Sequence, residues 1–320
     1  MRTKTNFWLA KRVNFFYGWM ILPISILASV FTSPGQTFMV SVFNPSLRET
    51  LNLSLTQLTG AYMFGTVLAS LPQTYIGQLA DRIGIRKTLL IIIGLFSLAC
   101  VFISQVNSLT MLFISFFFLR MLGQGALELL SMNMLPMWFR NTLGTVSGIK
   151  NVAINLMIGI VPVGILALIG LVGWRQTYII AGASVFLILL PIVYFFYINR
   201  PEEIGQLIDG DKASDSPETV DLDIPETDHN LKEAMRTRAY WILILAWFAW
   251  AAIATAITFN LLPIFTDKGL TEEQAAASFT ILMVVSAIFQ IVGGIVADRI
   301  QLRWMAFGAL GLYGLAIIAL

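Results

Sequence analysis

Long runs of apolar residues, separated by short polar segments, fill most of this chain. A helix that crosses a bilayer needs about 20 mainly apolar residues. Nine runs have about this length: 18–43, 56–80, 88–106, 110–137, 144–171, 175–198, 239–265, 274–297 and 304–320. Basic residues precede the first run, as in a signal peptide, but eight further runs follow, so we interpret it as an uncleaved first helix. The pattern predicts an all-α membrane protein with nine spans.

One long polar segment, residues 199–238, interrupts this pattern. It holds 11 of the 18 acidic residues and few apolar ones, so we predict a mobile linker. Its end, residues 231–238, has helical spacing and is either a helix on the membrane surface or an extension of the seventh span. The predicted domains are a six-helix lobe (1–198), the linker (199–238) and three helices of a second lobe (239–320).

Composition narrows the class of protein further. The chain is 57% hydrophobic and 12% charged, with a net charge of +2, whereas soluble domains have about 25% charged residues. A soluble enzyme, a disordered protein and a nucleic-acid binder are therefore excluded. With one cysteine (Cys100) and one histidine (His229), the chain has no disulfide framework and no Cys/His metal site of the usual spacing. No nucleophile–base pair or cofactor motif stands out, so we expect neither an enzyme nor a cofactor.

Lysine and arginine are distributed unevenly between the segments that join the spans. If the N-terminus is cytoplasmic, the inside segments hold 15 basic residues and the outside segments hold 3. Such an excess marks the cytoplasmic side of a membrane protein. We therefore predict a cytoplasmic N-terminus and linker, in a plasma membrane and specifically a bacterial inner membrane.

Part of the sequence repeats at an offset of 217 residues. The matching positions are Gly77, Asp81, Arg82 and Arg86 with Gly294, Asp298, Arg299 and Arg303, and Leu53-Ser54 and Gln57 with Leu270-Thr271 and Gln274. Spans one to three are thus echoed by spans seven to nine. Parallel repeats on either side of a central loop are typical of two-lobed transporters with a substrate path between the lobes.

Three motifs resemble those of the major facilitator superfamily. Gly77-Gln-Leu-Ala-Asp81-Arg82-Ile-Gly84-Ile-Arg86-Lys87 is similar to its signature loop, and Gly294-Ile-Val-Ala-Asp298-Arg299 is similar to the second copy of that loop. Arg120-Met-Leu-Gly123-Gln-Gly125 resembles the motif of its fourth helix. The resemblance implies a major facilitator fold with two pseudo-symmetric six-helix lobes. Since that fold has twelve helices, we expect this chain to be a fragment whose second lobe is truncated after its third helix.

Other stretches resemble the oxalate/formate and monocarboxylate porter branch of that superfamily. They are Tyr17-Gly-Trp19, Trp138-Phe139 with Gly144 and Gly148, Gly173-Trp174-Arg175, and Pro201-Glu-Glu-Ile-Gly205 with Asp209-Gly210-Asp211. The resemblance implies an organic anion as substrate. However, relatives in this branch carry a lysine in helix one and an arginine in helix eight, and the corresponding stretches here, Gly35-Gln36-Thr37-Phe38 and residues 274–297, have no charge.

The signature-loop residues imply a gate. They are Gly77, Asp81, Arg82, Gly84, Arg86, Lys87, Asp298 and Arg299. We expect Asp81 to bind a helix N-terminus of the other lobe when the cytoplasmic side closes, a contact worth about 0.3–1 kcal/mol. Asp298 and Arg299 would form a weaker second latch. The basic residues of the first loop also suit positive-inside anchoring.

Charged residues inside spans are costly and mark ion or substrate paths. Only Arg120, Glu128 and Lys150 are of this kind. Arg120, Gln124 and Glu128 are spaced four apart and predict one slanted polar stripe on a helix. Arg120 either binds a carboxylate or phosphate in the central cavity or holds its helix in place. Glu128 is either a proton carrier or a fixed counter-ion that pairs with Lys150.

Uncharged polar residues complete the candidate substrate site. They are Gln36, Thr37, Gln124, Asn155, Asn260 and Gln290, and each either contacts the solute or makes a hydrogen bond between helices. Gly144 and Gly148 form a small-xxx-small pair for close helix packing.

These observations predict a secondary transporter for a small polar or anionic organic solute. It would alternate between inward-open and outward-open states. A proton is the first candidate for the coupling ion, because Glu128 is the only embedded acid. The alternative is a transporter-like membrane receptor that senses a solute without moving it. The expected partners are the solute and the lipid bilayer, with no nucleic acid, and the expected state is a monomer.

Overall fold

The structure is a computed structural model. It describes residues 15–210, 231–250 and 272–300, together with 304–305, 307–309, 311–312 and 314. The predicted site residue Asn260, residues 211–230 of the linker and most of the span at 304–320 lie outside the described residues. By their contacts the residues form two compact units, residues 1–213 with 289–320 and residues 214–288. This division does not test the predicted lobe boundaries, which stay a prediction.

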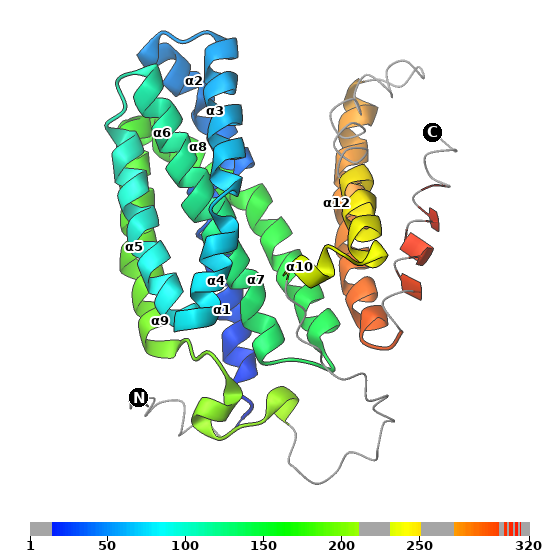
Figure 1. The fold of residues 1–320 in the computed structure, drawn as a ribbon. Helices are drawn as coiled ribbons and strands as arrows, with labels where there is room; N and C mark the ends of the chain where they lie inside the picture. Colours follow the sequence, from blue (N-terminus) through cyan, green and yellow to red (C-terminus); the bar gives the residue numbers. More distant parts are fainter. Residues whose placement is uncertain are drawn as a thin grey trace, which may run out of the picture. The chain divides into compact units, whose positions relative to one another are not determined.

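The first four spans are built from helices with short breaks (Figure 1). The first span comprises α1 (Gly18–Val30), the 3₁₀ turn η2 (Ser33–Gly35) and α2 (Thr37–Leu51), and the second comprises α3 (Leu55–Ser70) and α4 (Gln73–Ile83). The third is α5 (Ile85–Ser104). The fourth comprises α6 (Leu109–Leu119), the π-helix η3 (Arg120–Leu127), α7 (Glu128–Met134) and the 3₁₀ turn η4 (Leu135–Met137).

The fifth and sixth spans share one long helical stretch. It comprises α8 (Leu143–Ser184), the π-helix η5 (Val185–Leu189) and α9 (Leu190–Phe196). Two 3₁₀ turns follow, η6 (Pro201–Ile204) and η7 (Ile208–Gly210), and Figure 1 shows this segment turned back beneath the start of α1. The helices α1, α5 and α8 begin at one end of the bundle, and α4 and α9 finish there. We call it the linker end.

Glycine and serine residues set several of the boundaries. Ser54 begins α3 with a capping box, in which its side chain and that of Gln57 bond each other's backbone.

The 54 residues of Leu143–Phe196 would extend about 80 Å as one helix, far more than a bilayer of about 30 Å. Gly173 has φ 81° and ψ 161° and divides them into two spans. This confirms the predicted boundary between residues 171 and 175.

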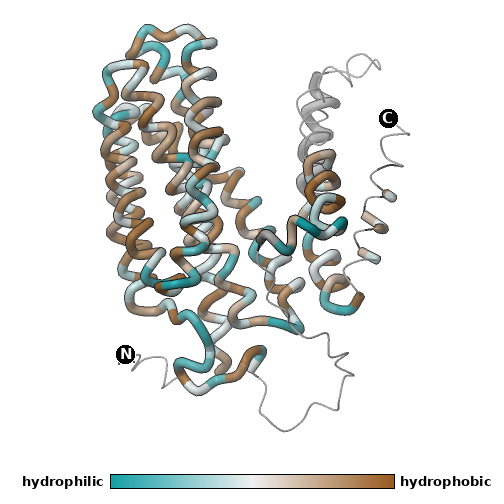
Figure 2. The backbone as a smooth tube through the Cα atoms, in the orientation of Figure 1, coloured by the Kyte–Doolittle hydropathy of each residue, from teal (hydrophilic) through white to brown (hydrophobic). Residues whose placement is uncertain are grey.

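Four helical stretches of the described chain are long and apolar enough to cross a membrane. They are Gly18–Gly35, Ile85–Ser104, Leu109–Met137 and Leu143–Phe196. Hydrophobic residues run along most of each helix (Figure 2), and many large apolar residues are exposed, such as Leu98 and Leu171 at 66% and 82%. Exposed apolar area of this extent suits contact with lipid tails.

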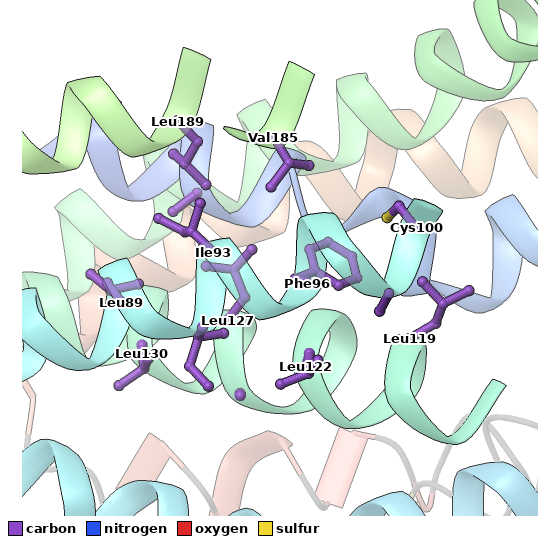
Figure 3. Close-up of a cluster of buried hydrophobic side chains, with 14 of the residues drawn as sticks. Leu89, Ile93, Phe96, Cys100, Leu119, Leu122, Leu127, Leu130, Val185 and Leu189 are labelled. Atoms are coloured by element: carbon purple, nitrogen blue, oxygen red, sulfur yellow. The ribbon is translucent and has the colours of Figure 1, made fainter. Parts of the chain in front are cut away.

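The centre of the bundle holds one cluster of buried apolar side chains. Figure 3 shows Leu89, Ile93, Phe96 and Cys100 of α5 facing Leu119, Leu122, Leu127 and Leu130 of the fourth span and Val185 and Leu189 of η5. Phe96 lies where a side chain on Gly123 would be, with its ring 2.6 Å from that position. Gly123 thus lets α5 and η3 pack closely.

Residues 214–288 form the second unit. Its described part contains α10 (Leu231–Ala234), a helix over Arg238–Trp250, and the first part of α12 (Glu272–Ala297). Residues 235–237 are a turn and bend, so the stretch 231–238 is not a continuous extension of the seventh span. The last turns of α12, from Phe289, belong to the first unit.

Candidate functional site

Arg120 is buried, with 8% of its surface exposed, and is bonded to three helical elements. Its Nε donates to Thr66 Oγ1 of α3 at 3.1 Å. One terminal nitrogen donates to the carbonyl oxygen of Gly35 in η2 at 3.1 Å and to Thr37 Oγ1 of α2 at 3.2 Å. The guanidinium also lies 5.0 Å from the centroid of the Tyr62 ring. The planar group of Arg120 therefore joins the first, second and fourth spans at the break in the first span.

The π-helix η3 separates two residues that were predicted to share one stripe. A π-helix has i→i+5 hydrogen bonds, so residues four apart do not line up as they do in an α-helix. Arg120 contacts η2 and α3, whereas Glu128 reaches Ser29 of α1. The prediction of a regular α-helix here is therefore wrong, although Arg120 and Glu128 both contact the first span, through Gly35 and Ser29. Met121, inside η3, accepts a hydrogen bond on its carbonyl oxygen from Gln73 Nε2 at 3.0 Å, and Gly125 leaves the space for that side chain.

Glu128 and Lys150 belong to one buried cluster, joined by serine side chains. Lys150 is 4% exposed, and its Nζ donates to the carbonyl oxygen and the Oγ of Ser131 at 3.0 and 2.9 Å. Ser29 Oγ lies 2.5 Å from Ser131 Oγ and donates to Glu128 Oε1 at 3.2 Å. Ser25 Oγ donates to the carbonyl oxygen of Ser131 at 2.9 Å. Within the described chain the two charges are thus connected through Ser131 and Ser29.

The other predicted solute-binding residues have different hydrogen-bond partners. Gln36 Nε2 donates to Thr32 Oγ1 at 2.9 Å, within its own span. The side-chain oxygen of Gln124 is buried and has no hydrogen-bond partner among the described residues. Asn155 Nδ2 of α8 donates to Gln290 Oε1 of α12 at 3.0 Å, which brings these two candidates together.

Asp298, which directly follows α12, bonds the first turn of α8. We call the contact between α8 and the end of α12 the seam. Its carboxylate accepts hydrogen bonds from the backbone N–H groups of Gly144 and Thr145 at 2.5 and 2.8 Å and from Thr145 Oγ1 at 2.5 Å. These N–H groups belong to the first turn of α8, where four donors lack partners inside the helix and the helix dipole favours negative charge. Arg299 is exposed.

Glycine residues let the two helices approach at this seam. A side chain on Gly144 would overlap the carbonyl oxygen of Gly294, and a Cβ on Gly148 would lie 2.7 Å from that of Gln290. The pair Gly144 and Gly148, spaced as small-xxx-small, therefore faces α12.

The first signature loop has a different environment. Asp81 is exposed near the end of α4, and the described residues offer its carboxylate no partner. Gly84 has φ 88°, and the next turn is fixed by Asn199 Oδ1, which accepts from the Arg86 N–H at 2.9 Å. The Arg86 guanidinium donates to the carbonyl oxygen of Tyr194 in α9. Gly77, Arg82 and Lys87 complete the loop, and Arg82 and Lys87 are exposed.

The segment after α9 is held against the linker end by specific hydrogen bonds. Gln206 Oε1 accepts from the Tyr17 N–H at 2.8 Å, and its Nε2 donates to the carbonyl oxygen of Phe15 at 3.0 Å. Trp138 Nε1 donates to the carbonyl oxygen of Ile198 at 3.2 Å. The Tyr17 hydroxyl donates to the carbonyl oxygen of Phe196 at 2.7 Å, and burial raises the pKa of that phenol, with the charge of Arg86 opposing the rise.

The repeated signature loop, the helical bundle and the contact of Asp298 with α8 all point to the superfamily that the motifs resemble. Residues 26–320 match the sequence model of the Major Facilitator Superfamily. The chain belongs to the Major Facilitator Superfamily.

Two relatives illustrate what this superfamily member resembles. The uncharacterized MFS-type transporter YhjX of Escherichia coli strain K12 is 24% identical over 300 residues, which cover 89% of this chain and 68% of that protein. The structure of the proton:xylose symporter XylE, bound to 6-bromo-6-deoxy-D-glucose, matches with a TM-score of 0.58 at 15% identity. It covers 88% of this chain and 70% of XylE, and at this identity it supports the fold alone. Membership makes the protein a multi-pass membrane transporter with an all-helical major facilitator fold.

Several residues of these clusters were missed by the sequence prediction. They are Ser25, Ser29, Tyr62, Thr66, Gln73 and Ser131. Serine, threonine and tyrosine are common in apolar helices, so their type alone gives no signal. The available signal was their spacing, since Ser25 and Ser29 are four residues apart and share one face of the first span.

Proposed function

We propose that this protein is a secondary transporter that moves a small polar or anionic organic solute by alternating access, with a proton as the coupling ion. The observation that carries the proposal is the contact of Asp298, from the second sequence repeat, with the first turn of α8 in the first six helices. Such a contact between the first six helices and the second repeat can break and re-form, so it can close one side of a path without chemical change. In this proposal the linker end faces the cytoplasm, as the distribution of basic residues predicts.

The charges of the first six helices support an anionic or strongly polar solute. Arg120 and Lys150 are buried and positive, and Glu128 is the one embedded acid of these spans. One positive charge in excess is unfavourable in an apolar interior, and a carboxylate of the solute would compensate it. Asn155 lies in the first six helices and Gln290 in the second repeat, and both are suited to contact the solute when the seam opens.

Proton coupling is proposed from the Glu128 cluster. Glu128 is half-buried, its Oε1 accepts a hydrogen bond from Ser29, and Ser29 and Ser131 connect it to the Lys150 ammonium. The structural neighbour XylE is a proton:xylose symporter, which makes the proton the first coupling ion to test.

The test is uptake into proteoliposomes that contain the protein at its full natural length. Labelled monocarboxylates, dicarboxylates, amino acids and neutral sugars are compared with and without a pH gradient. We expect saturable uptake of a carboxylate, stimulated by the gradient, and we expect Glu128→Gln to lose the stimulation. Saturable binding of a carboxylate without any uptake would instead support the receptor alternative. Stimulation that persists in Glu128→Gln would exclude this residue as the proton carrier.

A further inference from the structure

A second carboxylate, that of Asp209 in η7, binds the loop that leads into α8. Its oxygens accept hydrogen bonds from the N–H groups of Arg140 at 3.1 and 3.2 Å and of Asn141 at 2.9 Å. Thr142 Oγ1 lies 3.4 Å from Asp209 Oδ1. The N–H of Asp209 itself donates to the carbonyl oxygen of Trp138 at 3.0 Å. Asp209 thus bonds the backbone between Trp138 and Asn141 through both its side chain and its main chain.

The backbone at Asp209 is in an unfavourable region for a residue with a side chain. Its φ is 61° and its ψ is 2°, and only one other non-glycine residue of the described chain, Asn52, has a positive φ. Glycine would adopt this conformation without cost, but glycine has no carboxylate. The position therefore combines a left-handed backbone with an acidic side chain whose oxygens are all bonded.

The segment that carries Asp209 is itself fixed. Gln206 bonds the backbone of Phe15 and Tyr17 at the start of the first span, and the ring of Phe16 packs against Gly210. Asp209 is therefore presented from a rigid support rather than from a free loop.

The start of α8 depends on this support. Its N-cap residue, Thr142, makes no side-chain hydrogen bond to the helix, so the helix has no capping residue of its own. The next two N–H groups in the turn, those of Gly144 and Thr145, bond Asp298. Two carboxylates thus hold adjacent segments, Asp209 the loop at residues 140–142 and Asp298 the first turn of α8 at residues 144–145.

We propose that Asp209 is a positioning residue for the latch: it fixes the loop 138–142 so that the N–H groups of Gly144 and Thr145 point to Asp298. The segment after α9 thereby sets how readily the seam between α8 and α12 closes. This inference rests on the proposed function, in which closing of the seam is one half of the transport cycle.

The test measures opening of the seam rather than uptake, so that it can fail independently of the proposed function. Ser147 of α8 is half-buried, three residues from Gly144 and next to Gly148. A Ser147→Cys reporter in a Cys100→Ala background is labelled with a maleimide in the purified full-length protein. Asp209→Asn and Asp298→Asn are compared singly and together, and Glu202→Gln is the matched control, because Glu202 is an exposed acid of the same segment.

We expect each single variant to raise the labelling rate by roughly two- to fivefold, the range that follows from losing a carboxylate at a helix N-terminus. The double variant should be no faster than Asp298→Asn alone, because Asp209 acts through Asp298. Glu202→Gln should label like the parent. Asp209→Gly provides a second variant, since it relieves the left-handed backbone and removes only the carboxylate, and it should open the seam as Asp209→Asn does.

Two results would overturn the inference. One is an unchanged labelling rate in Asp209→Asn and Asp209→Gly, with or without a lower melting temperature, because a purely structural role predicts loss of stability alone. The other is a multiplicative rise in the double variant, which would show that Asp209 acts independently of Asp298.

Discussion

Arg120 shows how a buried charge can be held by neutral groups. Its donors reach two hydroxyl groups and one carbonyl oxygen, and its planar face lies over Tyr62. The acceptors come from separate elements, α2, α3 and η2, so the side chain is a structural link as well as a candidate for solute binding. A lysine has a compact ammonium that cannot reproduce this planar set of donors.

We therefore expect Arg120→Lys to lower both stability and uptake. The loss of charge-assisted hydrogen bonds should cost about 1–3 kcal/mol, seen as a lower melting temperature. Cys100 is fully buried, so its reaction with a thiol-reactive dye reports unfolding. Arg48→Lys, an exposed arginine of α2, is the control and should melt like the wild type. Normal uptake by Arg120→Lys would remove the special binding role of the guanidinium.

The Glu128 cluster gives a second prediction for single residues. Lys150→Met and Glu128→Gln should each destabilise the protein by about 1–3 kcal/mol, because each leaves polar groups without a partner. The double variant should cost less than the sum. Ser131→Ala should resemble Lys150→Met, whereas Ser115→Ala, at a buried serine that bonds only its own helix, should have a small effect. Strictly additive losses in melting experiments would show that the two charges are not coupled.

At the scale of helices, the contact between α8 and α12 depends on the absence of side chains. Gly148 leaves room for the backbone of Gln290, while Gly164, farther along the same helix, has no atom within 4 Å of a would-be Cβ. The two glycines therefore lie on the same helix, but only Gly148 faces a closely packed backbone.

Gly148→Ala should hold the seam open, and Gly164→Ala should not. Overpacking of a close contact costs about 1–3 kcal/mol, whereas alanine in place of an open helical glycine gains about 0.5–1 kcal/mol. The Ser147→Cys labelling assay distinguishes them, with faster labelling expected for Gly148→Ala alone. Equal labelling in both variants would contradict close packing at this seam.

At the scale of the whole molecule, the charge distribution predicts the orientation in the membrane. The segments predicted to be inside contain fifteen basic residues, and those predicted to be outside contain three. A cysteine introduced at Asp215, in a Cys100→Ala background, should react with an impermeant maleimide only after intact cells are opened. A cysteine at Arg48, on a predicted outside segment, should react in intact cells. Reaction of the Asp215 position from outside would reverse the assignment.

The sequence alone determined the class of protein, the spans within residues 15–210 and the repeat. Apolar runs of membrane length, the break at Gly173 and the matching signature loops are local properties, and a residue and its neighbours in the chain are enough to reveal them. The family followed from the same motifs. Site residues were predicted less well, because residue type shows that a group is polar but does not show what it bonds.

Tertiary structure decided the hydrogen-bond partners of the buried and gating residues. Lys150 bonds Ser131, nineteen residues away, and Asp298 bonds Gly144, 154 residues away. The segment from Arg120 to Leu127 is a π-helix, where the spacing predicted an α-helix. These outcomes depend on where helices cross, and each crossing is set by many small packing contacts between segments far apart in sequence. Hydrophobic periodicity records which faces are apolar, but it carries no record of which helix each face meets.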